Sequence, residues 1–290
     1  MAWLTLLLLV AVTGLSAYLR HSAAGLGCAP WPTCFGQGER SVAGAMVVGG
    51  QALTIARGAH RLTATLALLL LMATVFLSLA KRPRLRREGA LSSILLVLAL
   101  LLALLGVFTP GSRLPAVAIG NLLGGFLMLA IAARLVAPPA QRRLGGWAVA
   151  AALLLLAQIA LGAFTSAAFA GLACTELREC FEQARAGGWD WAALNPWREP
   201  VLGVGTPQSD GALAQLLHRL GSGIVAPLLA WFGVYAWRHG RRWEAITLLP
   251  LLASQMALGL VVGSAGLPLV PVLLHNLGTA LMLALLLRLA

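Results

Sequence analysis

Residues 81–109 read KRPRLRREGALSSILLVLALLLALLGVFT, a short basic segment followed by an uncharged apolar run that begins at Leu91. An apolar run of about 20 residues is long enough for a helix to cross the hydrocarbon core of a bilayer. That core offers no water to backbone amides, so the run predicts a transmembrane helix. Lys and Arg concentrate in cytoplasmic loops, so the basic segment predicts a cytoplasmic start for this helix.

Similar runs occur along the whole chain, with ends that the sequence defines only to within a few residues. They lie near residues 3–19, 61–80, 91–109, 115–136, 147–165, 213–236, 245–263 and 268–288. The first run lacks a preceding basic segment and has a poor cleavage pattern, so we interpret it as a retained helix rather than a signal peptide. The sequence therefore predicts an all-α membrane protein with eight transmembrane helices.

The composition supports the same class of protein. Of the 290 residues, 60% are hydrophobic and only 10% are charged, whereas soluble domains carry about 25% charged residues. The net charge of +12 lies mainly in short loops between the apolar runs. Nucleic-acid binding would need basic residues gathered on one exposed surface, so we expect a membrane-lipid environment and no nucleic-acid partner.

The loop charges predict the orientation of the chain. The basic segments lie at 81–87, 134–143, 238–242 and Arg288. The opposite loops include two long ones, near 20–60 and 166–212, and the second of these carries most of the acidic residues. Under the positive-inside rule both termini are cytoplasmic. We expect a multi-pass protein of a bacterial inner membrane, with the long loops on the oxidising outer side.

The sequence also repeats itself. Ala-Gly-Leu-Gly-Cys at 24–28 recurs as Ala-Gly-Leu-Ala-Cys at 170–174, and His-Arg-Leu at 60–62 recurs at 218–220. When the fourth run is aligned with the eighth, Asn121 is opposite His275. Internal repeats of this kind indicate a duplicated architecture.

The predicted fold is consequently two repeated four-helix bundles with the same orientation in the membrane. The N-terminal bundle spans residues 1–138 and the C-terminal bundle spans 139–290. Parallel repeats in membrane proteins are usually related by an axis along the membrane normal.

Each long outer loop contains a pair of cysteines in a C-x5-C arrangement, Cys28 with Cys34 and Cys174 with Cys180. Three interpretations are open: structural disulfides, redox-active thiols and a metal site. An oxidising compartment favours disulfides, and each would contribute roughly 2 kcal/mol of loop-closure entropy. Zinc ligand pairs usually have closer spacing.

The histidines divide into two groups. His21 and His239 lie in predicted loops, where a solvated side chain is the simpler interpretation. His60, His218 and His275 lie in the outer half of apolar helices, where ionisable groups are costly and tend to be functional. His218 and His275 share one bundle at similar depth, and imidazole is a standard axial ligand of heme iron. Zinc would require a third or fourth ligand.

Small and basic residues accompany these histidines. Gly221, Gly223 and the segment 278–280 would allow a flat macrocycle to approach the helix backbones, although ordinary helix packing also favours small residues. Arg61 and Arg219 directly follow two of the histidines. They could bind heme propionates or extend to lipid headgroups, and the sequence leaves both roles open.

These motifs together resemble the heme A synthase family of terminal-oxidase assembly enzymes, over essentially the whole chain. The motifs are Ala17-Tyr18-Leu19-Arg20, Gly25-Leu26-Gly27-Cys28, Trp31-Pro32-x-Cys34, the His-Arg pairs at 60–61 and 218–219, and His275. The Cys-x5-Cys loop with its Trp-Pro, placed before a His-Arg helix, is the specific part.

The resemblance implies an oxidoreductase that converts the ring-D methyl of heme O to a formyl group by successive hydroxylations, giving heme A. It implies a heme b cofactor between His218 and His275, and His60 as the catalytic ligand of the substrate iron. Cys28 and Cys34 would assist heme transfer or redox chemistry. Heme O synthase and oxidase assembly factors would be partners.

The sequence departs from the family pattern in its N-terminal half. Asn121 replaces a fourth histidine, Arg57 replaces a glutamate, and Pro30 replaces an aspartate of the first outer loop. Two alternatives to the enzyme therefore stand beside it. One is a non-catalytic heme-binding membrane protein, an electron carrier or heme-delivery factor for oxidase assembly, and the other is a quinone-linked cytochrome b.

The loop charges generate a topology prediction. A reporter that is active only in the periplasm should be active when fused after Thr206 and inactive when fused after Arg86, because these positions lie in an outer and a basic loop. The reverse activities would overturn the orientation and, with it, the argument that the cysteines lie in an oxidising compartment.

Overall fold

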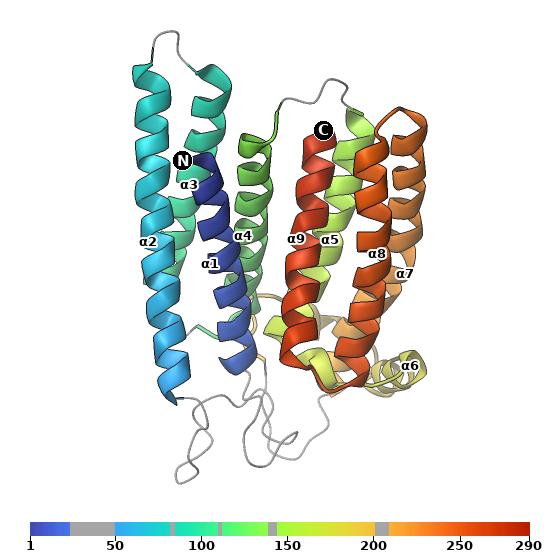
Figure 1. Cartoon of the computed structure of the whole chain (residues 1–290). Helices are drawn as coiled ribbons and strands as arrows, with labels where there is room; N and C mark the ends of the chain where they lie inside the picture. Colours follow the sequence, from blue (N-terminus) through green and yellow to red (C-terminus); the bar gives the residue numbers. More distant parts are fainter. Residues whose placement is uncertain (24–49, 82–84, 110–111, 139–143, 201–208) are drawn as a thin grey trace.

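The computed structural model describes the chain except for residues 24–49, 82–84, 110–111, 139–143 and 201–208. The described residues are helical and contain no β-strand. Eight of the helices are long and apolar enough to cross a membrane, which confirms the number predicted from the sequence (Figure 1). They are α1 (Ala2–Ala23), α2 (Gly50–Ala80), α3 (Arg86–Phe108), α4 (Pro115–Val136), α5 (Gly146–Ala167), α7 (Ser209–Arg238), α8 (Arg242–Ser264) and α9 (Leu269–Leu289).

One helix begins well before the apolar run that predicted it, which starts near residue 61. α2 begins at Gly50 and is 31 residues long, or about 46 Å at 1.5 Å per residue. Since the hydrocarbon core is about 30 Å thick, α2 extends beyond it. A helix supplies its own backbone hydrogen bonds on both sides of that boundary. His60 therefore lies ten residues inside α2, and His218 nine residues inside α7.

The long helices pack in two rings of four. α1 contacts α2 and α4, and α3 joins α2 to α4. In the same way α5 contacts α7 and α9, and α8 joins α7 to α9. In the first ring α2 and α4 lie at opposite corners, and in the second ring α7 and α9 do. α4 packs against α5 and α9, and α1 also contacts α9, which connects the two rings.

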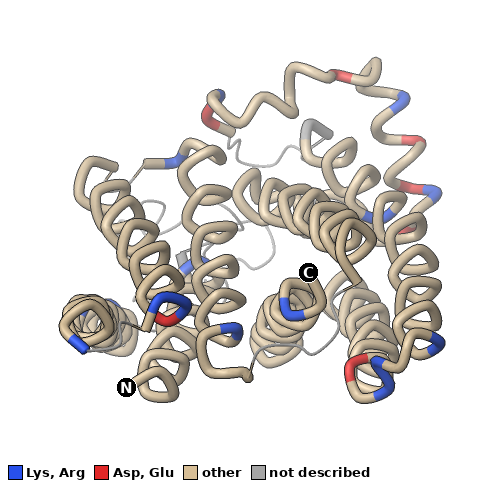
Figure 2. The backbone as a smooth tube through the Cα atoms, turned by 90° about the horizontal axis from the view of Figure 1, so that it is seen from above, with Lys and Arg blue, Asp and Glu red and all other residues tan. Residues whose placement is uncertain are grey.

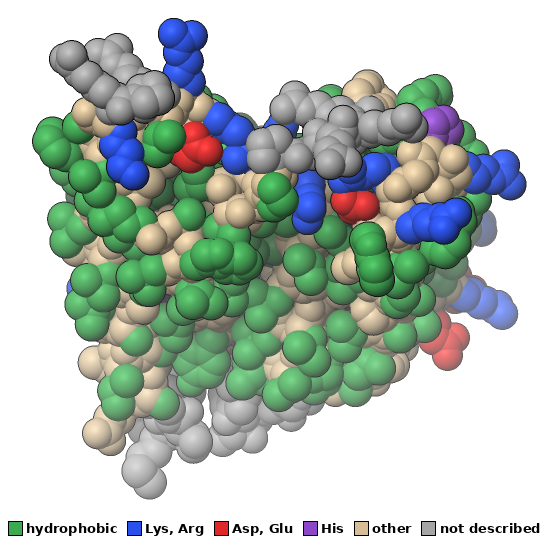
Figure 3. All heavy atoms as spheres, turned by 45° about the horizontal axis from the view of Figure 1, so that its top comes forward, with side chains coloured by type: hydrophobic (Ala, Val, Ile, Leu, Met, Phe, Trp, Pro, Cys, Tyr) green, Lys and Arg blue, Asp and Glu red, His purple; other side chains and the backbone are tan. Residues whose placement is uncertain are grey.

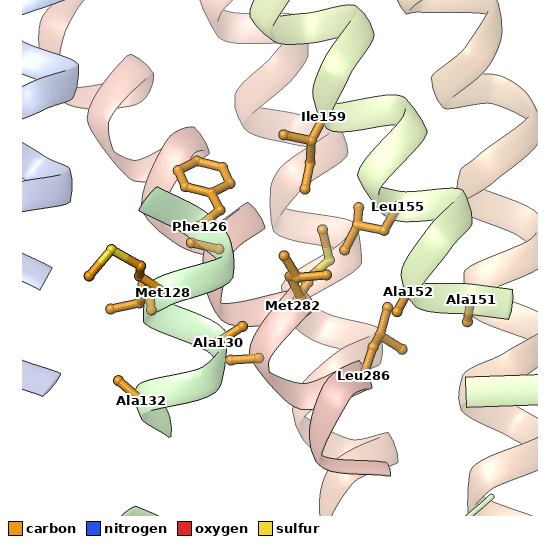
Figure 4. Close-up of a cluster of buried hydrophobic side chains, with 14 of the residues drawn as sticks. Phe126, Met128, Ala130, Ala132, Ala151, Ala152, Leu155, Ile159, Met282 and Leu286 are labelled. Atoms are coloured by element: carbon orange, nitrogen blue, oxygen red, sulfur yellow. The ribbon is translucent and has the colours of Figure 1, made fainter. Parts of the chain in front are cut away.

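The seam between the rings holds much of the buried core. Figure 4 shows side chains of α4, α5 and α9 interdigitating there, including Phe126, Leu155 and Met282. Large apolar side chains on the outer faces, such as Phe76 and Leu260, are exposed instead. Exposed apolar surface of this extent marks a lipid-facing or partner-facing molecule, and lipid chains fit the eight apolar helices.

Both chain termini lie at the same end of the helices (Figure 1). Basic side chains gather at this end, which we call the basic end (Figures 2 and 3). There the buried Glu244 pairs with Arg241, and Arg288 Nε lies 4.0 Å from the same carboxylate. Arg87 Nη2 donates to the carbonyl of Arg134 at 2.6 Å, which satisfies a backbone oxygen at the end of α4.

The opposite end, which we call the loop end, carries the folded connection between α5 and α7. It contains two short 3₁₀ turns, η2 (Ala170–Leu172) and η3 (Trp191–Leu194), and the amphipathic helix α6 (Leu177–Ala186). Figure 1 shows α6 lying across the end of the helices. Cys174 and Cys180 form a disulfide with a Cα–Cα distance of 5.1 Å, and both are buried against α7.

The start of α6 is held by its own polar side chains. The backbone N–H and hydroxyl of Thr175 donate to the carboxylate of Glu179 at 2.6 and 2.7 Å. These hydrogen bonds lower the pKa of Glu179, because they favour the charged carboxylate. The carboxylate therefore stabilises this connection above its unfolded pKa, and the contribution is lost as the pH falls through the lower folded value.

A side-chain hydrogen bond links the two rings of helices at the loop end. His21 Nε2 lies 2.8 Å from the carbonyl oxygen of Leu267, between α1 and the turn from α8 to α9. The expectation that His21 is merely solvated was wrong, because α1 continues to Ala23 and brings the half-buried imidazole against the Leu267 carbonyl. His239 is exposed, in agreement with the expectation.

The disulfide generates a stability prediction. Replacing both Cys174 and Cys180 with serine should lower the free energy of unfolding by roughly 2 kcal/mol, since the closed loop is short, and should leave the helices assembled. Thermal unfolding in detergent measures the loss. Mass spectrometry after alkylation without reductant should find no free thiol at either position in the parent protein, and free thiols there would contradict the disulfide.

Candidate functional site

His218 and His275 lie at opposite corners of the ring formed by α5, α7, α8 and α9. Both imidazole side chains are half-buried, and they are close enough to interact electrostatically. Each histidine lies in the half of its helix nearer the loop end. The structure therefore brings together the two histidines that the sequence paired.

The His218 ring is fixed by α5. Gln158 Nε2 lies 3.0 Å from His218 Nδ1 and donates to the backbone carbonyl of His218 at 2.8 Å. One turn further along α5, Gly162 lies against the edge of the ring. A Cβ atom at Gly162 would lie 2.8 Å from Cε1 of His218, too close for a carbon contact, so this glycine allows the close approach.

His275 is held more loosely by α8. Its Nδ1 atom is buried and makes no hydrogen bond of ordinary geometry, although the His275 ring lies near enough to the backbone of Gln255 for a long one. A Cβ atom at Gly259 would lie 3.5 Å from Cε1 of His275, in ordinary contact. The hydroxyl of Thr279 lies 2.7 Å from the His275 carbonyl and 2.9 Å from Gln255 Oε1.

The two histidines share one packing arrangement. Each is followed after three residues by a glycine, and a glutamine of the neighbouring helix lies against that glycine, Gln158 on Gly221 and Gln255 on Gly278. The sequence analysis missed these glutamines. The signal was present, because Gln158-Ile-Ala-Leu-Gly162 recurs as Gln255-Met-Ala-Leu-Gly259, and an amide within an apolar helix needs a polar partner.

The other ring holds His60 and Asn121 at opposite corners, on α2 and α4. His60 is half-buried, with the side chains of Arg20 and Arg61 near enough to interact with it electrostatically. Asn121 is also half-buried. Three residues after Asn121, a Cβ at Gly124 would lie 2.7 Å from Cδ2 of Leu102 of α3, so a leucine occupies the place that Gln255 has in the C-terminal ring.

The two arginines that follow the histidines, Arg61 and Arg219, differ in their exposure and contacts. Arg61 is exposed near the loop end of α2, and Arg57 is exposed one turn before it. Arg219 donates from Nη1 to the Thr175 carbonyl at 2.9 Å and from Nη2 to the Cys174 carbonyl at 3.1 Å. Arg219 therefore anchors the disulfide-containing connection beside His218. Cys28, Cys34 and Pro30 lie outside the described residues.

The arrangement around His218 and His275 fits a heme with two imidazole ligands. Two imidazoles at opposite corners of one ring of helices, each half-buried, suit a flat group placed between the helices. In the described part of the chain, no three His, Cys, Asp or Glu side chains cluster as a metal site formed by protein ligands alone would require.

Comparison with known proteins agrees with these features. Residues 1–287 match the COX15-CtaA family, described as cytochrome oxidase assembly proteins. A heme A synthase from Shewanella oneidensis is 31% identical over 317 aligned residues, which cover 98% of this chain and 93% of the relative. The eight apolar helices and this family identify a multi-pass membrane protein. The chain thus belongs to the COX15-CtaA family of cytochrome oxidase assembly proteins.

Proposed function

We propose that this protein is a heme A synthase of a bacterial inner membrane, an oxidoreductase that converts the ring-D methyl of heme O to the formyl of heme A. The relative from Shewanella oneidensis, matched over nearly its full length, supports this function. The observation that carries the proposal is the pair of half-buried histidines on α7 and α9, at opposite corners of one helix ring. Heme O and heme A are then substrate and product, with heme O synthase and oxidase assembly factors as partners.

His218 and His275 would hold a heme b cofactor in the C-terminal ring. Such a heme, when bound by two imidazoles, supplies one-electron transfer. The chain's own contribution is to orient the two rings and exclude water. Gln158 and Gly162 position His218, whereas Gly259 and Thr279 surround His275.

The N-terminal ring would bind the substrate, with His60 as the ligand to its iron. An amide is a much weaker iron donor than imidazole, so Asn121 leaves the opposite corner without a strong ligand. The farnesyl tail of heme O would lie among apolar side chains, where each buried methylene contributes about 0.8 kcal/mol. Arg61 and Arg219 would bind propionates at the loop end, Arg219 with the N–H groups that do not contact Cys174 and Thr175.

We also propose that the two rings are repeated bundles, residues 1–138 and 139–290, with both termini cytoplasmic. The matching ring contacts and the shared end of the termini support this arrangement. The heme sites would then lie toward the periplasmic side, next to the cysteine loops. Cys28 and Cys34 would form a second disulfide.

The function is tested by co-expressing the protein with a heme O synthase and separating the extracted hemes by chromatography. Heme A in the extract supports the enzyme. Heme B and heme O without heme A would contradict it and favour the heme carrier, whose motivation is the replacement of a histidine by Asn121.

The cofactor site generates a spectroscopic prediction. Changing His218 or His275 to alanine should abolish the low-spin heme b spectrum of the purified protein, because each removes one of two axial ligands. His239→Ala is the matched control, since His239 is exposed at the basic end and should leave the spectrum unchanged. A normal bis-imidazole spectrum in the double variant would refute the assignment.

The substrate site generates a separate prediction. His60→Ala should abolish heme A formation while the low-spin heme b spectrum persists, because His60 belongs to the other ring. Asn121→Ala should have a much smaller effect, and Asn121→His should convert the substrate iron from high-spin to low-spin. Heme A extraction and absorption spectra measure these outcomes. Parental amounts of heme A from His60→Ala would show that the active site lies elsewhere.

A further inference from the structure

The contact between Gln158 and His218 constrains the chemistry of the histidine. A backbone carbonyl only accepts hydrogen bonds, so the Gln158 atom 2.8 Å from the His218 carbonyl is the amide nitrogen. The same nitrogen lies 3.0 Å from His218 Nδ1. In this arrangement Nδ1 accepts a hydrogen bond and the ring proton of a neutral imidazole is on Nε2.

A histidine that binds iron through Nε2 carries its proton on Nδ1 instead, and that N–H is usually donated to an acceptor. Gln158 can supply one. A half-turn of its amide group exchanges the positions of Nε2 and Oε1. The nitrogen then takes the place that Oε1 has against Gly221, where the missing side chain leaves room. The half-turn gives up the bond to the His218 carbonyl, from whose oxygen Oε1 must move away because both atoms are acceptors. In exchange, Oε1 accepts a hydrogen bond from the His218 Nδ1–H.

We propose that Gln158 is a positioning residue for His218, which accepts the Nδ1 proton of the ring and thereby sets its strength as an iron ligand. This proposal rests on the cofactor site proposed above. An acceptor at Nδ1–H makes the imidazole a better electron donor, so it favours ferric over ferrous iron. Gly162 allows the edge of the His218 ring to pack closely against α5, beside the amide.

The rest of the structure shows that this contact is specific. Gln255 occupies the equivalent place on α8, but its side chain bonds to Thr279 and not to the His275 ring. In the N-terminal ring, the matching position against Gly124 is Leu102, which has no hydrogen-bonding group. Among the described residues, His218 thus has a side-chain partner at Nδ1, whereas His275 has only the backbone of Gln255 nearby, so the two proposed axial ligands differ in the kind of partner.

Two substitutions of nearly the same size test the proposal by the sign of their effects. Gln158→Met removes the acceptor and should shift the heme toward the ferrous form. Gln158→Glu offers only acceptor oxygens and should shift it toward the ferric form. In a redox titration of the purified holoprotein, we expect each to change the ferric-to-ferrous ratio at fixed potential by roughly tenfold, about 59 mV for a one-electron couple.

Gln215→Met is the matched control. Gln215 is buried on α7, one turn before His218, and its amide donates to the Gly171 carbonyl at 3.1 Å. The redox titration of the Gln215→Met holoprotein should equal that of the parent. Paramagnetic resonance of the ferric forms should show altered g values for both Gln158 variants and parental values for Gln215→Met.

The outcomes separate this proposal from the proposed function. Opposite shifts in the two Gln158 variants support the role, and loss of heme from Gln158→Met with retention in Gln158→Glu and Gln215→Met supports it as well. A parent with a low-spin heme and Gln158 variants that titrate unchanged, or shift in the same direction, would overturn this proposal alone. A parent without a low-spin heme would overturn the cofactor site and this proposal together.

Discussion

A polar group in the hydrocarbon core of a membrane needs a partner from the protein, because water is absent. The backbone of this chain meets that requirement by folding into long helices, whose polar groups bond within each segment. The same requirement then governs the few polar side chains inside the helices. Thr63 and Thr74 return their hydroxyls to carbonyls of the preceding turn, whereas Gln158 reaches the neighbouring helix, where it bonds to His218.

Helix packing follows from the need to bring such groups together. Interhelical contact in lipid depends on small residues that let backbones approach, and the glycines beside the histidines provide that approach. A side chain at Gly162 would collide with His218, and one at Gly221 or Gly278 would collide with a glutamine. The small residues that the sequence offered as room for a macrocycle thus also make room for the polar side chains that support its proposed ligands.

The two rings have similar helix contacts but different polar content. In the C-terminal ring, a histidine stands at each of two opposite corners, and a glutamine accompanies each. In the N-terminal ring, Asn121 lies at the corner opposite His60, and Leu102 takes the position of Gln255. A ring with two supported imidazoles suits a permanently held cofactor, whereas a ring with one imidazole and an apolar surround suits a substrate that must enter, react and leave.

Local sequence determined most of the fold. Apolar run length gave the eight helices, and loop charge gave the orientation that we propose, because both properties reside in contiguous segments. Sequence spacing also singled out His218 and His275. The apolar run placed the start of α2 too late, since a helix continues past the hydrocarbon boundary that hydropathy detects.

What only the tertiary structure decided is which helix faces which. Gln158 and His218 are 60 residues apart, and His21 and Leu267 are 246 residues apart, so no local pattern predicts that they meet. The same is true of Arg219, whose guanidinium is turned toward the carbonyls of Cys174 and Thr175. Such contacts depend on side-chain packing between distant segments. There, small residues such as glycine set the distance between helix backbones and so select one arrangement of the helices.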